Sequence, residues 1–145
     1  MNLYTIGFRK KSAREFFGKL LQYKVKKILD IRLNNVSQLA GYTKRNDFEF
    51  FLKTICHIDY CHLPDLAPTQ EILDEFKKNK GSWQVYEVKF NELIRVRQIE
   101  KLVTKELLSD ACLLCSEPTS EHCHRRLVAE YLQIHFPNIK ITHIP

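Results

Sequence analysis

A chain of 145 residues is long enough for one domain with one substantial hydrophobic core. Hydrophobic residues make up 44% of it and charged residues 28%, which is ordinary for a globular protein, and no apolar run approaches the roughly 20 residues that span a bilayer. The net charge is +6, and five cysteines without a secretory pattern at the N-terminus argue against a disulfide framework and for free thiols in a reducing cytoplasm.

Short apolar segments alternate with helical patterns along the chain. Residues 2–6 predict a strand, and Ser12 with Glu15 has the spacing of a capping box at the start of a helix. Residues 27–31 predict a second strand, and residues 33–45 a polar loop. The later predicted elements are a helix from Asn46, a strand over 58–63, helical patterns over 69–80 and 83–108, a strand over 111–115, a helix to about residue 135 and a strand over 139–144.

This alternation predicts an α/β fold. We expect a single three-layer domain over residues 1–145, with a mainly parallel sheet of about five strands and helices on both faces. Ligand sites in such sheets lie outside the carboxyl ends of the strands. Chemically distinctive residues follow four of the predicted strands, so they should meet along one edge: Gly7-Phe8-Arg9, Asp30-Ile31-Arg32, His62 and Cys115-Ser116-Glu117.

Cys115 ends the fourth predicted strand, where a thiol can serve as a nucleophile or redox group. Rhodaneses and cysteine phosphatases share this topology, but they place an arginine six residues after the cysteine, and here that position is Glu121. The alternative is that Cys115 is a small buried hydrophobic residue. Glu117 can act as a general base or pair with an arginine.

Asp30 lies inside an apolar strand, so its charge needs a partner, and Arg32 lies two residues later on the same face. Together with Glu117 and Arg125, these residues form either a structural ion-pair network or an acid/base site with phosphate-binding guanidinium groups. The sequence leaves both interpretations open.

Cys123 and His124 fall in the first turn of the next helix if Ser120 is its cap, and both then lean toward the buried face. Cysteine and histidine are zinc ligands, but adjacent helical residues diverge by about 100°, so the spacing argues against a metal site. A dithiol switch between Cys115 and Cys123 is a further possibility. His122 is interpreted as an ordinary surface residue.

The segment Gly41-Tyr42-Thr43-Lys44-Arg45 joins an aromatic ring to two cations, a composition that suits stacking on a base and holding a phosphate. A solvated turn explains it equally well. Residues 1–60 carry a net charge of +7 and residues 61–145 a net charge of −1. A basic half favours a phosphate-bearing partner, although a lysine-rich surface gives the same count.

Several of these motifs together resemble domain-of-unknown-function family 488. They are Thr5-Ile6-Gly7, Asp30-x-Arg32, Tyr60-Cys61-His62-Leu63-Pro64, and Leu114-Cys115-x-Glu117 followed by Cys123-His124-Arg125. The resemblance spans essentially the whole chain and implies a compact α/β domain with these residues lining one pocket, without implying an activity. The chain departs from the family pattern at Arg9, where members often have serine, and at Asn34-Asn35, where they often have proline.

The leading hypothesis is a small cytoplasmic enzyme that acts on a phosphate-bearing substrate, a nucleotide or nucleic acid. Asp30 and Glu117 would supply acid/base catalysis, assisted by Cys115 or His124. The other predicted binding residues are Gly7, Phe8, Arg9, Arg32, Tyr42, Lys44, His62, Cys123 and Arg125. The alternatives are a non-catalytic nucleic-acid or nucleotide binding module and a thiol-based redox or sulfur-transfer protein using Cys115. No membrane partner is expected and no residue is assigned as a metal ligand, and the sequence leaves the cofactor, the need for a metal and the oligomeric state open.

Overall fold

The computed structural model describes residues 1–34, 41–117 and 119–145. Within these ranges, five strands form one sheet in the order β3-β2-β4-β1-β5, and every pair of neighbours is parallel. The prediction of an α/β fold with a mainly parallel sheet is therefore confirmed. The strands are β1 (Asn2–Gly7), β2 (Lys27–Asp30), β3 (Asp59–His62), β4 (Ala111–Cys115) and β5 (Lys140–His143).

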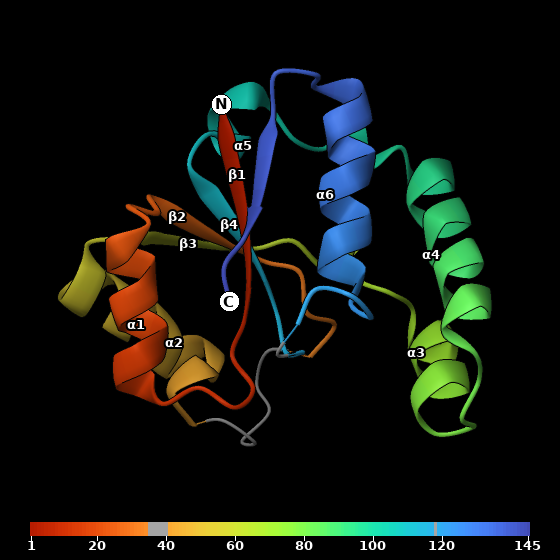
Figure 1. Cartoon of the computed structure of the whole chain (residues 1–145), viewed down its shortest axis with the longest axis horizontal. Helices are drawn as coiled ribbons and strands as arrows, with labels where there is room; N and C mark the ends of the chain where they lie inside the picture. Colours follow the sequence, from red (N-terminus) through yellow and green to blue (C-terminus); the bar gives the residue numbers. More distant parts are fainter. Residues whose placement is uncertain (35–40, 118) are drawn as a thin grey trace.

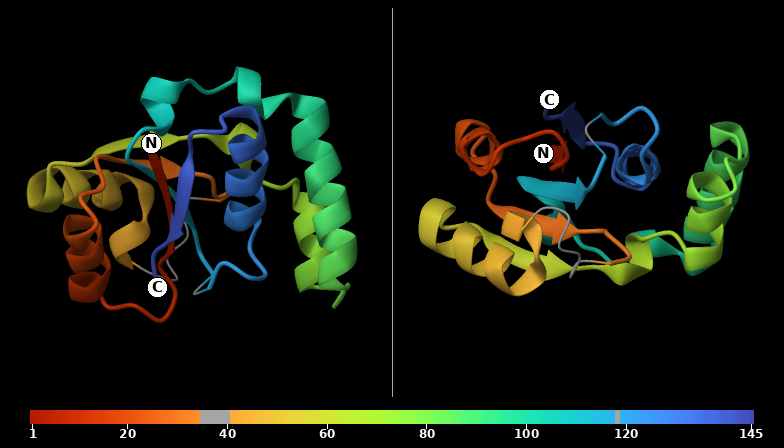
Figure 2. Two further views of the ribbon diagram at one scale, coloured as in Figure 1. Left: turned by 45° about the horizontal axis from the view of Figure 1, so that its top comes forward. Right: turned by 90° about the horizontal axis from the view of Figure 1, so that it is seen from below.

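Helices cover both faces of the sheet, which gives three layers (Figure 1). Helices α1 (Ala13–Gln22) and α2 (Arg45–Phe51) lie on one face, and α6 (His124–His135) lies on the other. Helices α3 (Gln70–Lys77) and α4 (Trp83–Arg97) pack outside α6, as the view from below in Figure 2 shows. Shorter helical segments are η1 (Gly41–Thr43), η2 (Leu52–Cys56), η3 (Pro64–Leu66), η4 (Ile99–Lys101) and α5 (Lys105–Leu108).

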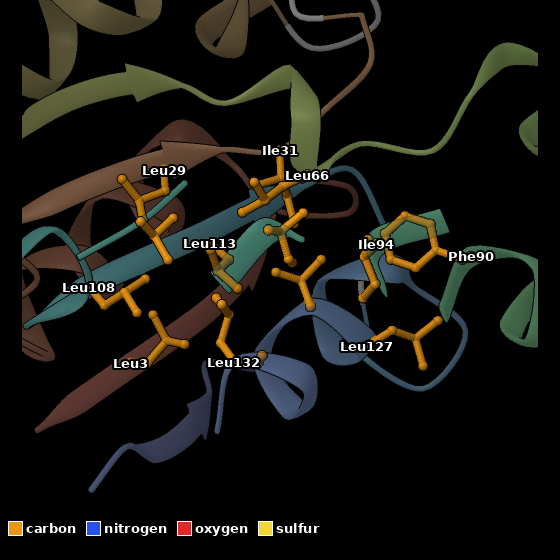
Figure 3. Close-up of a cluster of buried hydrophobic side chains, with 14 of the residues drawn as sticks. Leu3, Leu29, Ile31, Leu66, Phe90, Ile94, Leu108, Leu113, Leu127 and Leu132 are labelled. Atoms are coloured by element: carbon orange, nitrogen blue, oxygen red, sulfur yellow. The ribbon is translucent and has the colours of Figure 1, made fainter. Parts of the chain in front are cut away.

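The core is divided by the sheet because side chains alternate along each strand. On the α6 face, Leu3, Leu29 and Leu113 of the strands cluster near Leu132, and Leu127 continues the cluster to Phe90 and Ile94 of α4 (Figure 3). On the opposite face, α1 and α2 pack against the other alternating set, which includes Ile6, Ile28, Cys112 and Leu114. By the same alternation Cys115 belongs to the α6 face and Asp30 to the α1 face.

The predicted helical pattern over 83–108 is interrupted in the structure. Helix α4 ends at Arg97 because Gln98 adopts a left-handed backbone conformation with φ of 54°, and α5 starts afresh after a Thr104 cap. The predicted cap at Ser12 is confirmed, since its Oγ accepts from the Glu15 backbone N–H at 3.1 Å. The predicted loop over 33–45 includes residues 35–40, which lie outside the described residues. No helix in the described ranges is long and apolar enough to cross a membrane.

Candidate functional site

A pocket of about 410 Å³ opens at the carboxyl ends of β1, β2 and β4. This is the edge at which the predicted site residues were expected to meet. Seven of them line it: Phe8, Arg9, Arg32, Cys115, Glu117, Cys123 and His124. The remaining lining is largely apolar and aromatic, and it comprises Leu33, Asn34, Pro68, Gln70, Leu73, Phe76, Lys77, Tyr86, Ser116 and His122.

Helices α3 and α4 form a wall of this pocket that sequence reasoning missed. Tyr86 stacks on Trp83 with ring centroids 5.0 Å apart, and the His122 ring also stacks on Trp83 at 5.0 Å. Phe76 of α3 packs against both aromatic residues of α4. The helical periodicity of α4 predicts that it packs, but only the tertiary structure shows that it packs beside the cysteine loop.

Cys115 and Cys123 form the floor of the pocket, with their sulfur atoms joined as a disulfide. Cys115 is the last residue of the fully buried strand β4, and Cys123 is the N-cap of α6. The prediction that Ser120 caps this helix is wrong. The helix begins only at His124, and Cys123 has an extended backbone with φ of −137°.

Arg125 lies beneath this cysteine pair and is 1% exposed. Its Nη1 donates to Cys115 Sγ at 3.1 Å and to the Glu117 backbone oxygen at 2.6 Å, whereas Nε is buried with no hydrogen-bond partner. Among the described residues, no carboxylate lies within ion-pair distance of this guanidinium. Burial lowers the pKa of Arg125 to about 10, so the group is still charged at neutral pH.

His124 closes the inner end of the pocket. Its Nε2 lies 2.7 Å from the Ile31 backbone oxygen, and its ring meets the Phe90 ring edge-on at 5.5 Å. Burial lowers the pKa of His124 to about 4, so the imidazole is neutral at pH 7. A carbonyl oxygen can only accept, so Nε2 carries the proton and the lone pair is on Nδ1.

Glu117 stands at the mouth of the pocket between two cations. Its carboxylate contacts Lys77 Nζ at 2.6 Å and Arg9 Nη1 at 3.6 Å. The two cations are 42% and 53% exposed, so this cluster belongs to the rim. The pairing of Glu117 with an arginine, one of the two predicted roles, is present in the structure.

Asp30 and Arg32 form a buried bidentate ion pair on the α1 face of the sheet. Arg32 Nε and Nη2 each donate to an Asp30 oxygen at 2.8 Å, and the Tyr60 hydroxyl donates to Asp30 at 2.6 Å. Arg32 also donates to the Thr43 backbone oxygen and lies over the Phe8 ring. Asp30 does not line the pocket. The geometry favours the structural interpretation of this pair, and its acid/base role stays a prediction.

The family model described as "Domain of unknown function DUF488" matches residues 12–132. The chain belongs to the DUF488 family. The matched region contains both pocket cysteines and Arg125, so the predicted resemblance is confirmed. Comparisons with curated proteins and with solved structures found no match.

Besides Arg125, which lies behind the cysteine pair, four predicted binding residues of this DUF488 domain do not line the pocket. The Tyr42 ring packs against Phe16 and Phe17, and its hydroxyl donates to backbone oxygens of the β1–α1 loop. Lys44 is the N-cap position of α2. His62 Nε2 lies 2.9 Å from the Arg32 backbone oxygen. Gly7 contacts the Glu117 loop, and the binding roles of all four residues stay predictions.

Three side chains of the DUF488 pocket form a group that can hold a metal ion. Ligand atoms of Cys115, Cys123 and His124 all lie within 4.8 Å of one another. The sequence argument against co-ligation assumed that both Cys123 and His124 are helical. Because Cys123 is extended, the angle of about 100° between helical neighbours does not apply to this pair.

Proposed function

We propose that this DUF488 protein is a thiol-dependent oxidoreductase that exchanges electrons with a substrate in the pocket through Cys115 and Cys123. The observation that supports it most strongly is the buried Arg125 guanidinium, whose Nη1 donates to Cys115 Sγ at 3.1 Å. A buried charge needs compensation. Since no described carboxylate pairs with Arg125, a Cys115 thiolate is the anion best placed to compensate it.

The arrangement suits dithiol–disulfide exchange. The Cys115 thiolate attacks one sulfur of a substrate disulfide, which forms a mixed disulfide and releases one substrate thiolate. The Cys123 thiolate then attacks Cys115 Sγ and releases the second. The enzyme loses two electrons, the substrate disulfide gains them, and the two thiol protons pass to the departing thiolates. In the reducing cytoplasm that the sequence predicts, both cysteines would start as thiols.

The pocket lining indicates the kind of substrate. Phe8, Phe76 and Tyr86 provide aromatic walls around the two sulfur atoms, and the charged groups stand at the mouth. Pockets of this kind bind small organic molecules through apolar contact and use a few polar groups for orientation. A small disulfide with apolar or aromatic substituents therefore fits better than a highly charged one.

A second candidate keeps the phosphate-bearing substrate predicted from the sequence. The observation that favours it is the pair of exposed rim cations, Arg9 and Lys77, facing the single carboxylate of Glu117. This rim has a net charge of +1 and would attract the phosphate groups of a nucleotide whose base enters the aromatic pocket.

The test is reduction of bis(2-hydroxyethyl) disulfide by reduced protein in the presence of a chelator. We expect release of two thiols per chain and a peptide in which Cys115 and Cys123 are linked. Cys123→Ser should accumulate the mixed disulfide at Cys115, and Cys115→Ser should be inert. Cys61→Ser removes a half-buried thiol of β3 outside the pocket and should behave as wild type. Equal reaction of Cys115→Ser and wild type would refute the proposal.

A further inference from the structure

Three buried side chains with atoms that can bind a metal ion cluster in the pocket: Cys115, Cys123 and His124. We propose that, when both cysteines are reduced, these three residues bind one thiophilic divalent cation, for which zinc is the best match. The side chains are 1%, 3% and 9% exposed, and their ligand atoms lie within 4.8 Å of one another. Two thiolates and one imidazole form one of the zinc ligand sets that proteins use.

His124 is oriented as a metal ligand would be. Its Nε2–H donates to the Ile31 backbone oxygen at 2.7 Å, which fixes the ring and leaves the Nδ1 lone pair for coordination. Histidine ligands of metal ions almost always donate their other ring N–H to a carbonyl or carboxylate in this way. The hydrogen bond therefore fixes the ring in the tautomer whose lone pair is on Nδ1.

The backbone spacing of the two cysteines also suits a metal bridge. Their Cα atoms are 7.6 Å apart. Disulfide-linked cysteines usually have Cα atoms about 4.4 to 6.8 Å apart. An ion between the sulfur atoms, with each metal–sulfur bond about 2.3 Å long, lengthens the bridge. A separation this wide therefore accommodates a metal bridge when the two cysteines are reduced.

Two thiolates neutralise the charge of a divalent cation itself, and the Arg125 guanidinium beside them leaves the group with a net charge of +1. Arg125 Nη1 remains in place to donate to Cys115 Sγ. Hydrogen bonds from neighbouring groups to ligand atoms orient the ligands and tune the metal.

The fourth coordination position faces the pocket, because all three ligands line it. The nearby Glu117 carboxylate does not take this position, because it is paired at the mouth with Lys77 Nζ at 2.6 Å and Arg9 Nη1 at 3.6 Å. Three protein ligands with one open position are typical of catalytic zinc sites, in which water or substrate completes the tetrahedron. The inferred site is therefore one that a small molecule in the pocket can reach.

Metal binding shares its thiols with the proposed exchange reaction and requires only that they be reduced. Each ion that binds displaces the protons that the two cysteines still carry, and oxidation to the disulfide removes both thiolates and releases the ion. A bound ion would hold Cys115 and inhibit exchange, so chelation should restore it.

The test is titration of reduced, metal-free protein with zinc in competition with a chromophoric chelator, followed by cobalt substitution. We expect one ion per chain and thiolate-to-cobalt charge-transfer absorption. Loss of an outer-shell partner already weakens metal binding roughly 10- to 100-fold, so Cys115→Ser, Cys123→Ser and His124→Gln should each weaken it at least a hundredfold. His124→Gln retains a donor for the Ile31 oxygen while removing Nδ1. Cys61→Ser is the control and should bind as wild type.

Alkylation of unmodified protein provides a second readout that depends on no variant. Zinc should protect Cys115 and Cys123 from a thiol reagent, with Cys61 as the internal reference. Equal zinc affinity in wild type and Cys115→Ser, or no protection of the pocket cysteines, would overturn the inference. The exchange assay in chelator reports separately on the proposed function. If exchange occurs without metal binding, only the inferred metal site is refuted. If metal binds but no exchange occurs, only the proposed oxidoreductase function is refuted.

Discussion

Gly7 lies where the loops after β1 and β4 touch. A Cβ at this position would overlap the Glu117 backbone oxygen and come within 2.7 Å of Arg125 Nη1. Neither neighbour can move freely, since one is backbone and the other is a buried guanidinium. The absence of a side chain at residue 7 therefore allows Arg125 to reach both the Glu117 carbonyl and the Cys115 sulfur.

Gly7→Ala should accordingly destabilise the protein. Overpacking of a tight site costs about 1 to 3 kcal/mol, and we expect about 3 kcal/mol because backbone must shift. Gly18→Ala is the matched control, with nothing within 4 Å of its Cβ inside α1. Its free energy of unfolding should rise by roughly 0.5 to 1 kcal/mol, because alanine has a higher helix propensity than glycine. Urea unfolding measures both, and equal stabilities of the two variants would contradict this account.

The buried Asp30 carboxylate balances the charge of the buried Arg32 guanidinium. Asp30→Asn retains the shape but leaves the buried Arg32 charge without its carboxylate. Breaking a buried pair in this way costs about 3 to 5 kcal/mol. We expect that loss in thermal or urea unfolding, with the disulfide-exchange rate per folded molecule unchanged. Loss of exchange activity in Asp30→Asn protein that remains fully folded would instead support the acid/base role predicted from the sequence.

The sequence predicted the Asp30–Arg32 pair because both partners lie two residues apart on one strand face. It did not predict that Arg125 reaches Cys115. That contact joins a helix to a strand across ten residues, and it depends on where α6 begins. Local spacing determines contacts within a strand, whereas a contact between elements requires the boundaries and packing of both.

At the scale of elements, the N-terminus of α6 lacks a good helix cap, and the residue at the cap position places a thiol in the pocket. Cys123 occupies the N-cap but makes no side-chain cap hydrogen bond, unlike Ser12, Thr69, Ser82 and Thr104 at other helices. Serine and threonine are preferred at this position because their oxygen accepts from the first-turn N–H groups. A cysteine here is a poor cap in a place where a sulfur atom reaches the pocket.

Cys123→Ser should therefore stabilise reduced, metal-free protein while it abolishes closure of the disulfide. A good cap is worth about 0.5 to 2 kcal/mol, and we expect a gain of about 0.5 kcal/mol because the site is buried. Ser82→Ala is the control in which a good cap is removed from α4, and its free energy of unfolding should fall by about 1 kcal/mol. Calorimetry on both variants measures the difference, and a large loss of stability in Cys123→Ser would show that its thiol packs rather than reacts.

The strands and the parallel sheet were largely predictable, whereas the end of α4 and its packing beside the pocket were not. Alternating apolar runs and helical patterns predicted the strands and the parallel sheet. The pattern over 83–108 appeared continuous, because hydrophobic periodicity does not reveal the left-handed residue Gln98 that ends α4. His122 is exposed, as predicted, and its ring also lines the pocket. The wall that Tyr86 adds to the pocket depends on α4 folding back beside α6, which no local pattern predicts.

At the scale of the whole molecule, the pocket mouth combines charges from distant parts of the chain. Arg9 follows β1, Lys77 ends α3 and Glu117 follows β4. The excess of positive charge in residues 1–60 suggested a phosphate-bearing partner, but it did not show which cations share a surface. In the structure a carboxylate sits between the two rim cations, so it competes with any phosphate for them.

Glu117→Gln should therefore raise the affinity for a phosphate-bearing ligand. Exposed ion pairs are worth about 0 to 1 kcal/mol, so removing the competing carboxylate should strengthen ATP binding roughly threefold, with a steeper dependence on salt. Isothermal titration at two salt concentrations measures the change. Glu121→Gln removes the same charge from an exposed position in the same loop and is the matched control, while Lys77→Gln should weaken binding. If Glu117→Gln binds ATP more weakly than wild type, Glu117 contacts the ligand itself, as the acid/base hypothesis requires.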